Sequence, residues 1–202
     1  MVPEPIAMAD PLPLVVSTRQ IASGIWQWSA FSPYHRVELG SHLVWDGVRA
    51  VVFDPLPLSD NLWDSWPILA KPEVLVVTNS NHERALDSWR MRFPDATIIG
   101  WPTSPTEVEV DNCLVGWKAI FLPGGAPGET AYHCADLDLV VFGDAVVNLA
   151  DRGLELLPDK YCQNGGQLRE SLRQFPRYGR ALMAHGEPLL EAASERIGAV
   201  LT

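Results

Sequence analysis

The chain has 202 residues, 47% of them hydrophobic and 20% charged, which is enough for one globular domain with a sizeable core. Its formal net charge of −10 leaves no excess of lysine or arginine to displace counterions from phosphates, so the composition excludes neither a small ligand nor a protein partner but disfavours nucleic acid and acidic membranes. No run of 18 apolar residues is present, so the sequence predicts no transmembrane helix.

The N-terminal residues 1–13 carry Glu4 and Asp10 among several prolines and lack the basic start of a secretory signal. We expect them to form an extended lead-in to a single domain over residues 14–202. Three widely spaced cysteines, odd in number, do not suggest a disulfide framework: Cys113, Cys134 and Cys162. Reduced thiols and a cytoplasmic location are therefore expected.

The first third of the domain has the pattern of short strands and turns. Alternating residues on both sides of Gly40-Ser41 predict a β-hairpin with strands at 35–39 and 42–45. Asp46-Gly47 predicts a second turn, which leads into the apolar run 50–53, a strand buried on both faces.

Strands and helices alternate at βαβ spacing in the middle of the chain, and the second half repeats the style. Further strands are predicted at 74–77, 96–99, 119–122, 130–134, 139–142 and 181–184. Helices are predicted over 59–70, 82–92, 166–175 and 188–197, the last with Pro188 in its first turn. Hairpins combined with βαβ units in each half predict an α/β fold, a four-layer αβ/βα sandwich of two mixed β-sheets with helices outside.

Polar residues follow four of the predicted strands. The carboxyl ends of strands are where α/β folds place their sites, because the loops there open into a crevice. The polar residues are Asp54, the cluster TNSNHER at 78–84, Gly143-Asp144, and His185 with Gly186. By contrast, His35, His42 and His133 lie in strand-like alternation and are expected to be structural or exposed.

The order of these motifs resembles the metallo-β-lactamase fold superfamily. That family has an early Asp, then Thr-His-x-His-x-Asp-His, Gly-His-Thr-Pro-Gly, Gly-Asp and a late Gly-His-Gly. The matching segments are FD at 53–54, TNSNHER at 78–84, GGAPG at 124–128, FGD at 142–144 and AHG at 184–186. The resemblance runs from about residue 25 to the C-terminus and implies the same sandwich, a hydrolytic activity, and a loop-holding role for Asp54.

The resemblance also implies metal ligands, and most of them are substituted. Histidines of a first metal position would be Asn79, Asn81 and Gly125, and neither an amide nor a glycine replaces imidazole toward zinc. We therefore expect this first position to be lost and its residues to line a cleft with Asp54 and Arg84.

A second metal position would use residues 83, 84 and 185, with Asp144 as a bridging carboxylate. The ligands that remain are Glu83, Asp144 and His185. Three protein ligands are the minimum for a catalytic ion with an open position for water, so one divalent ion, zinc, iron or manganese, is the most that we expect. His82 and Asp144 are the candidates for acid–base catalysis.

Three interpretations of the cluster stay open. The first is a hydrolase with a degenerate site, in which one metal ion activates water. The second is a non-catalytic pseudoenzyme whose cleft, closed by an ion pair of Arg84 with Asp144 or Glu83, binds a small ligand or a protein partner. The third is metal-free acid–base chemistry by His82 or His185. The sequence names no substrate, and self-association as a homodimer stays open.

Overall fold

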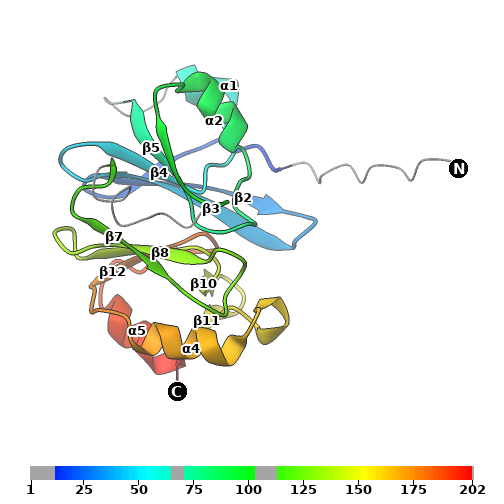
Figure 1. Cartoon of the computed structure of the whole chain (residues 1–202). Helices are drawn as coiled ribbons and strands as arrows, with labels where there is room; N and C mark the ends of the chain where they lie inside the picture. Colours follow the sequence, from blue (N-terminus) through cyan, green and yellow to red (C-terminus); the bar gives the residue numbers. More distant parts are fainter. Residues whose placement is uncertain (1–11, 65–70, 103–112, 202) are drawn as a thin grey trace, which may run out of the picture.

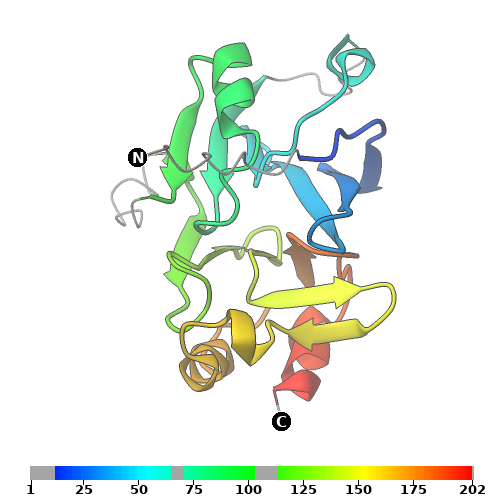
Figure 2. The same cartoon turned by 90° about the vertical axis from the view of Figure 1, so that its right-hand side faces the viewer.

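The protein has four layers, helices, sheet, sheet and helices, in a computed structural model that describes residues 12–64, 71–102 and 113–201 (Figure 1). After a quarter turn, the segments coloured blue to green still lie above those coloured yellow to red, so each half of the chain builds one sheet and its helices (Figure 2). The predicted αβ/βα sandwich is confirmed. No helix in the described part of the chain is long and apolar enough to cross a membrane.

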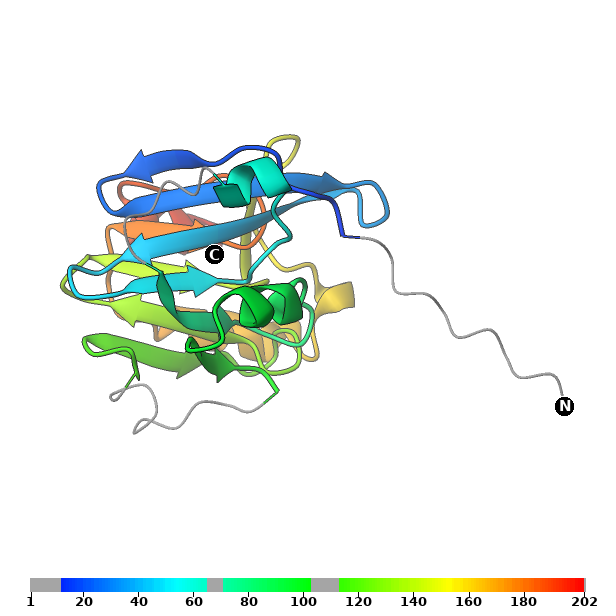
Figure 3. The ribbon, with the colours of Figure 1, turned by 90° about the horizontal axis from the view of Figure 1, so that it is seen from above.

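The first sheet has its strands in the order of the sequence. It consists of β1 (Arg19–Ala22), β2 (Ile25–Ser32), β3 (Val37–Trp45), β4 (Ala50–Phe53), β5 (Pro72–Val77) and β6 (Thr97–Gly100). The first four strands form an antiparallel meander, and β4, β5 and β6 are parallel. Seen from above, α1 (Asp60–Asp64) and α2 (Leu86–Arg92) lie over this sheet (Figure 3).

The second sheet has the strand order β12-β9-β8-β7, in which only the β12–β9 pair is parallel. Its strands are β7 (Trp117–Phe121), β8 (Thr130–Cys134), β9 (Leu139–Phe142) and β12 (Arg180–Met183). A separate hairpin and three helical segments complete this half: β10 (Val146–Leu149), β11 (Gly153–Leu156), η1 (Asp159–Tyr161), α4 (Gly165–Arg173) and α5 (Ala193–Val200).

Three apolar layers hold the sandwich together. The inner layer lies between the sheets and contains Phe53, Val76 and Val141, whereas each outer layer lies between a sheet and its helices. In the outer layer under α2, the rings of Trp28 and Trp89 stack with their centroids 5.7 Å apart. Because β4 and the part of β5 at Val74–Val77 are covered on both faces, these runs are apolar throughout, as the sequence predicts.

The hairpin predicted at Gly40-Ser41 is wrong, because β3 runs straight through both residues. Gly40 marks a close approach of the second sheet rather than a turn. Its N–H donates to the carbonyl of Ala184 over 2.7 Å, and a Cβ there would lie 3.3 Å from the carbonyl oxygen of Met183. The turn between β2 and β3 comes earlier, at residues 33–36, and Arg36 there has a φ of 55°.

Two helices begin later than the sequence predicts, because the first residues of each predicted helix form a turn or an extended segment instead. The segment before α2 turns at His82, whose N–H donates to the carbonyl of Asn79. The segment before α5 is extended, and Leu189 exchanges two main-chain hydrogen bonds with Ala181. Of the helix predicted over 59–70, only α1 (Asp60–Asp64) falls within the described residues, and most of the lead-in 1–13 falls outside them. Strands β1, β10 and β11 were not predicted.

Candidate functional site

The four polar strand ends meet at one edge of the sandwich, as their positions in the sequence predict. Asp54 follows β4, Thr78 and His82 follow β5, Asp144 follows β9, and His185 follows β12. Parallel strands bring their carboxyl ends to the same edge, and the facing sheets bring the two edges together. The site is therefore built from both halves of the chain.

Asp54 holds the loop after β5. Its two carboxylate oxygens accept hydrogen bonds from the N–H and the hydroxyl of Thr78, over 2.9 and 2.8 Å. Burial raises the pKa of this carboxyl, but the charges of His82 and Arg84 and the hydrogen bonds outweigh it and lower the pKa. Asp54 is therefore a buried carboxylate, and its loop-holding role now includes a contact with His82.

His82 lies between two carboxylates and is 1% exposed. Its Nδ1 is 2.9 Å from Oδ2 of Asp54 and 2.7 Å from the hydroxyl of Thr78, and its Nε2 is 3.1 Å from Oδ1 of Asp144. Burial and the charge of Arg84 lower the pKa of His82, but the two carboxylates outweigh them and raise it to about 9. Without a metal, His82 is therefore an imidazolium at neutral pH.

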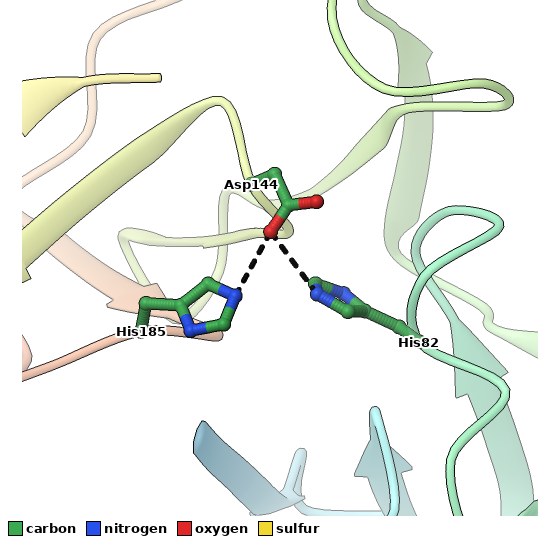
Figure 4. A group of neighbouring side chains, drawn as sticks. All are labelled: His82, Asp144 and His185. Carbon is green, nitrogen blue, oxygen red and sulfur yellow. Dashed lines mark hydrogen bonds and ion pairs between the residues drawn. The ribbon is translucent and has the colours of Figure 1, made fainter. Parts of the chain in front are cut away.

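His185 completes a cluster in which the three side chains converge (Figure 4). Its Nε2 is 2.9 Å from the same Oδ1 of Asp144, and its Nδ1 is 3.0 Å from the main-chain oxygen of Glu38. One potential ligand atom from each of His82, Asp144 and His185 lies within 4.8 Å of the others. These two imidazoles and one carboxylate are the donors that can hold a divalent metal ion.

Two residues of the predicted site have other positions. The side chain of Glu83 is exposed and lies outside this cluster, where His82 takes its place. Arg84 makes no ion pair within 4.0 Å with Asp144 or Glu83. Its guanidinium donates to the main-chain oxygens of Gly40, Asp54 and Ala184 over 2.6, 3.3 and 3.5 Å. Arg84 therefore ties β3 at Gly40 to the carboxyl ends of β4 and β12, and the cationic side chain in contact with Asp144 is His82.

No protein-family model and no curated protein matches the sequence, but solved structures match over nearly the whole chain. A metallo-β-lactamase from Erythrobacter litoralis, with β-mercaptoethanol in its active site, is 15% identical with a TM-score of 0.69, covering 93% of this chain and 96% of that one. The DIM-1 metallo-β-lactamase exposed to ceftazidime is 13% identical, with a TM-score of 0.67, covering 95% and 98%. This chain has the metallo-β-lactamase fold. The FIM-1 enzyme from Pseudomonas aeruginosa in its mono-zinc form is 12% identical, with a TM-score of 0.66, covering 96% and 97%.

The two asparagines at the positions that the resemblance assigns to a first metal hold carboxylates by hydrogen bonds. The amide of Asn79 donates to Oε2 of Glu129 over 2.7 Å and to Oδ2 of Asp144 over 3.2 Å. The amide of Asn81 donates to the same Oδ2 over 2.9 Å. These two amides hold Oδ2 of Asp144 and leave its Oδ1 for the two histidines.

Glu129 is a site residue that the sequence did not predict. Its side chain is fully buried, and its Oε1 accepts the N–H of Ala145 over 3.0 Å. Burial and the charge of Asp144 raise the pKa of Glu129 to about 8, so it is mainly protonated at neutral pH. A Cβ on Gly125 would lie 2.8 Å from Cγ of Glu129. The only signal in the sequence is an acidic residue between the GGAPG motif and the strand predicted at 130–134.

Proposed function

We propose that this protein is a hydrolase of the metallo-β-lactamase fold that uses one divalent metal ion, held by His82, Asp144 and His185. The observation that carries the proposal is the way in which both imidazoles are fixed. Each has its Nδ1 at an oxygen, a carboxylate for His82 and a main-chain carbonyl for His185, and each presents its Nε2 to Asp144. Metal-binding histidines are typically oriented by such a bond from their second nitrogen.

The Nε2 atom of His82 supports this assignment. It is buried, its 3.1 Å approach to Oδ1 of Asp144 lacks good hydrogen-bond geometry, and it meets no other acceptor among the described residues. An unsatisfied buried nitrogen is costly, and a metal ion at this point would satisfy it. The similar FIM-1 structure, which is described as a mono-zinc form, supports a single ion in this fold.

The residues around the cluster have separate tasks in this proposal. A bound metal ion would lower the pKa of a water molecule to near neutrality and so supply a nucleophile. Asp54 fixes the ring of His82, and Asn79 and Asn81 orient the carboxylate of Asp144. Because His82 must be neutral to bind a metal, the proton and the ion compete for it, and metal affinity should rise with pH.

A second candidate function is a non-catalytic protein whose cleft binds a small ligand. The observation that favours it is the charge of His82, whose pKa of about 9 places an imidazolium between Asp54 and Asp144. In this interpretation the imidazolium neutralises both carboxylates and replaces the metal permanently.

Metal loading distinguishes the two candidates. Protein without a histidine tag is loaded at pH 8.5 with zinc, manganese or, under anaerobic conditions, ferrous iron, then desalted and analysed by mass spectrometry of the metals. The proposal expects about one ion per chain for at least one metal, and its loss in Asp144→Asn and His82→Gln. His133→Gln, a histidine of β8 outside the cluster, is the matched control and should keep the ion. Only trace metal under every condition, with a melting temperature that chelators do not change, would refute the proposal and favour the second candidate.

A further inference from the structure

A cavity of about 490 Å³ lies in front of the cluster and contains His82, Asp144 and His185 in its wall. Its size is that of a site for a small molecule rather than for a single ion. Three segments form the remaining wall: the β2–β3 turn, the β10–β11 hairpin and the residues around η1. All three lie outside the metal cluster, so they are free to select what reaches it.

The charge of this wall is opposite to that of the chain. The chain has 25 acidic residues and 15 lysines and arginines, yet four arginine or lysine side chains and only two carboxylates line the cavity. Both carboxylates already have partners: Asp144 contacts the two histidines of the cluster, and Glu155 pairs with Arg152 at 3.3 Å. Arg84 is engaged with main-chain oxygens, so two cations of the wall remain for a ligand.

These two cations are Arg36, in the β2–β3 turn, and Lys160, in η1. Both side chains are exposed at the mouth, and neither pairs with a carboxylate in the part of the chain that the structure describes. The ammonium of Lys160 lies 4.6 Å from the ring centre of Tyr161, which leaves its hydrogen-bond donors available. Arg36 has a φ of 55°, a backbone conformation that few residues other than glycine adopt.

A large part of the cavity wall is apolar. It is formed by Val37, Leu39, Val147, Leu149 and Leu157. A ligand that fills this space therefore needs an apolar body, and a ligand that satisfies the mouth needs a negative charge at one end.

We infer that the cleft binds an organic anion with an apolar body, whose carboxylate or phosphate group is held by Arg36 and Lys160 at the mouth. The apolar body then lies on the aliphatic wall and points the far end of the molecule toward His82, Asp144 and His185. This inference deepens the proposed function by naming its substrate class, and it rests on that function only for the hydrolysis. Binding itself needs no metal.

Isothermal titration calorimetry with a matched set of eight-carbon probes tests the inference, on both metal-free and metal-loaded protein. Octanoate and octyl phosphate should bind, and the better of the two identifies the anionic group. Octanamide, which has the same apolar body without the charge, should bind at least about tenfold more weakly than octanoate. Acetate and inorganic phosphate, which have the charge without the body, should also bind weakly.

Substitutions locate the site. Arg36→Gln and Lys160→Gln should each weaken octanoate or octyl phosphate by about three- to tenfold, and the double variant should bind them no better than octanamide. Arg90→Gln, an exposed arginine of α2 outside the cavity, is the matched control and should not change binding. Equal binding of octanamide and octanoate, or an unchanged affinity in the double variant, would overturn the inference. Anion binding by protein that takes up no metal would uphold it while removing the proposed hydrolysis.

Discussion

The replacement of Gly125 by alanine tests whether Glu129 fills the place that a metal ligand would need. A Cβ on residue 125 would lie 2.8 and 2.9 Å from Cγ and Cβ of Glu129, closer than real side chains approach one another. These are the inner atoms of a buried side chain, so they cannot swing away as a flexible end could. Overpacking of this kind costs about 1–3 kcal/mol, and we expect Gly125→Ala to lower the free energy of unfolding by that amount.

Urea denaturation followed by tryptophan fluorescence measures this cost. Gly198→Ala is the matched control, because Gly198 lies in α5 and a Cβ there would meet no atom within 4 Å. Alanine is favoured over glycine inside a helix by about 0.5–1 kcal/mol, so this variant should be at least as stable as the parent. A glycine-to-alanine change as such would therefore not explain the loss at residue 125.

A double-mutant cycle with Glu129→Ala identifies the cause. The single variant Glu129→Ala is itself destabilising, because the N–H of Ala145 and the amide of Asn79 lose their acceptor. In that background the contact with Cγ is gone but the contact with Cβ at 2.9 Å remains, so Gly125→Ala should cost about 0.5–1 kcal/mol less than it does in the parent. The same cost in both backgrounds would refute the argument that Glu129 excludes a side chain at residue 125.

The remaining predictions concern charge. The pKa of His82 is raised to about 9 in the folded protein, so the stability that its charge contributes is fully present below the unfolded pKa of 6.5 and is lost as pH rises through 9. Thermal melts of chelator-treated protein should therefore show a loss of up to about 3 kcal/mol in the free energy of unfolding over this pH range. The variant His82→Gln should show little of this pH dependence. Burial outweighs the charge of Asp54 and lowers the pKa of His42 to about 3, so the free energy of unfolding should fall as pH drops from 6.5 toward 3. A His42→Gln variant that unfolds in acid at the same pH as the parent would contradict this. Arg84→Gln should lower the free energy of unfolding by about 1.5–3 kcal/mol, because the hydrogen bonds to Gly40 and Asp54 are lost. Arg84→Lys should recover only part of this loss. A urea denaturation curve equal to that of the parent would show that these bonds contribute nothing.

The sequence by itself determined the fold and the edge of the sheets at which the site lies. In strands such as β4 and β5, the runs 50–53 and 74–77 are apolar throughout because both of their faces are covered, and this pattern is visible without coordinates. The polar residues that end these strands, Asp54 and Asp144 among them, meet because the strand order brings their ends together. Order along the chain was enough for this part, since strand direction fixes which ends are neighbours.

The tertiary structure alone decided which side chains face one another. The segment TNSNHER does not continue as a helix: the side chain of Asn79 accepts the N–H of Asn81 over 2.8 Å, and Arg84 has a φ of 41°. This turn directs His82 inward and leaves Glu83 in solvent, although the sequence favoured the acid as a ligand. The geometry of this turn depends on Asp54 and Asp144, which are distant in the sequence, so the local sequence of the turn could not predict it.

Gly125 and Gly40 show the same limit. A glycine in a sequence indicates either a turn or a close approach, and only the neighbouring atoms distinguish the two. At residue 125 the neighbour is the side chain of Glu129, and at residue 40 it is the main chain of β12. The sequence therefore predicts the sheet edge at which the candidate site lies, but the packing of the two halves of the chain decides that His82, Asp144 and His185 converge there.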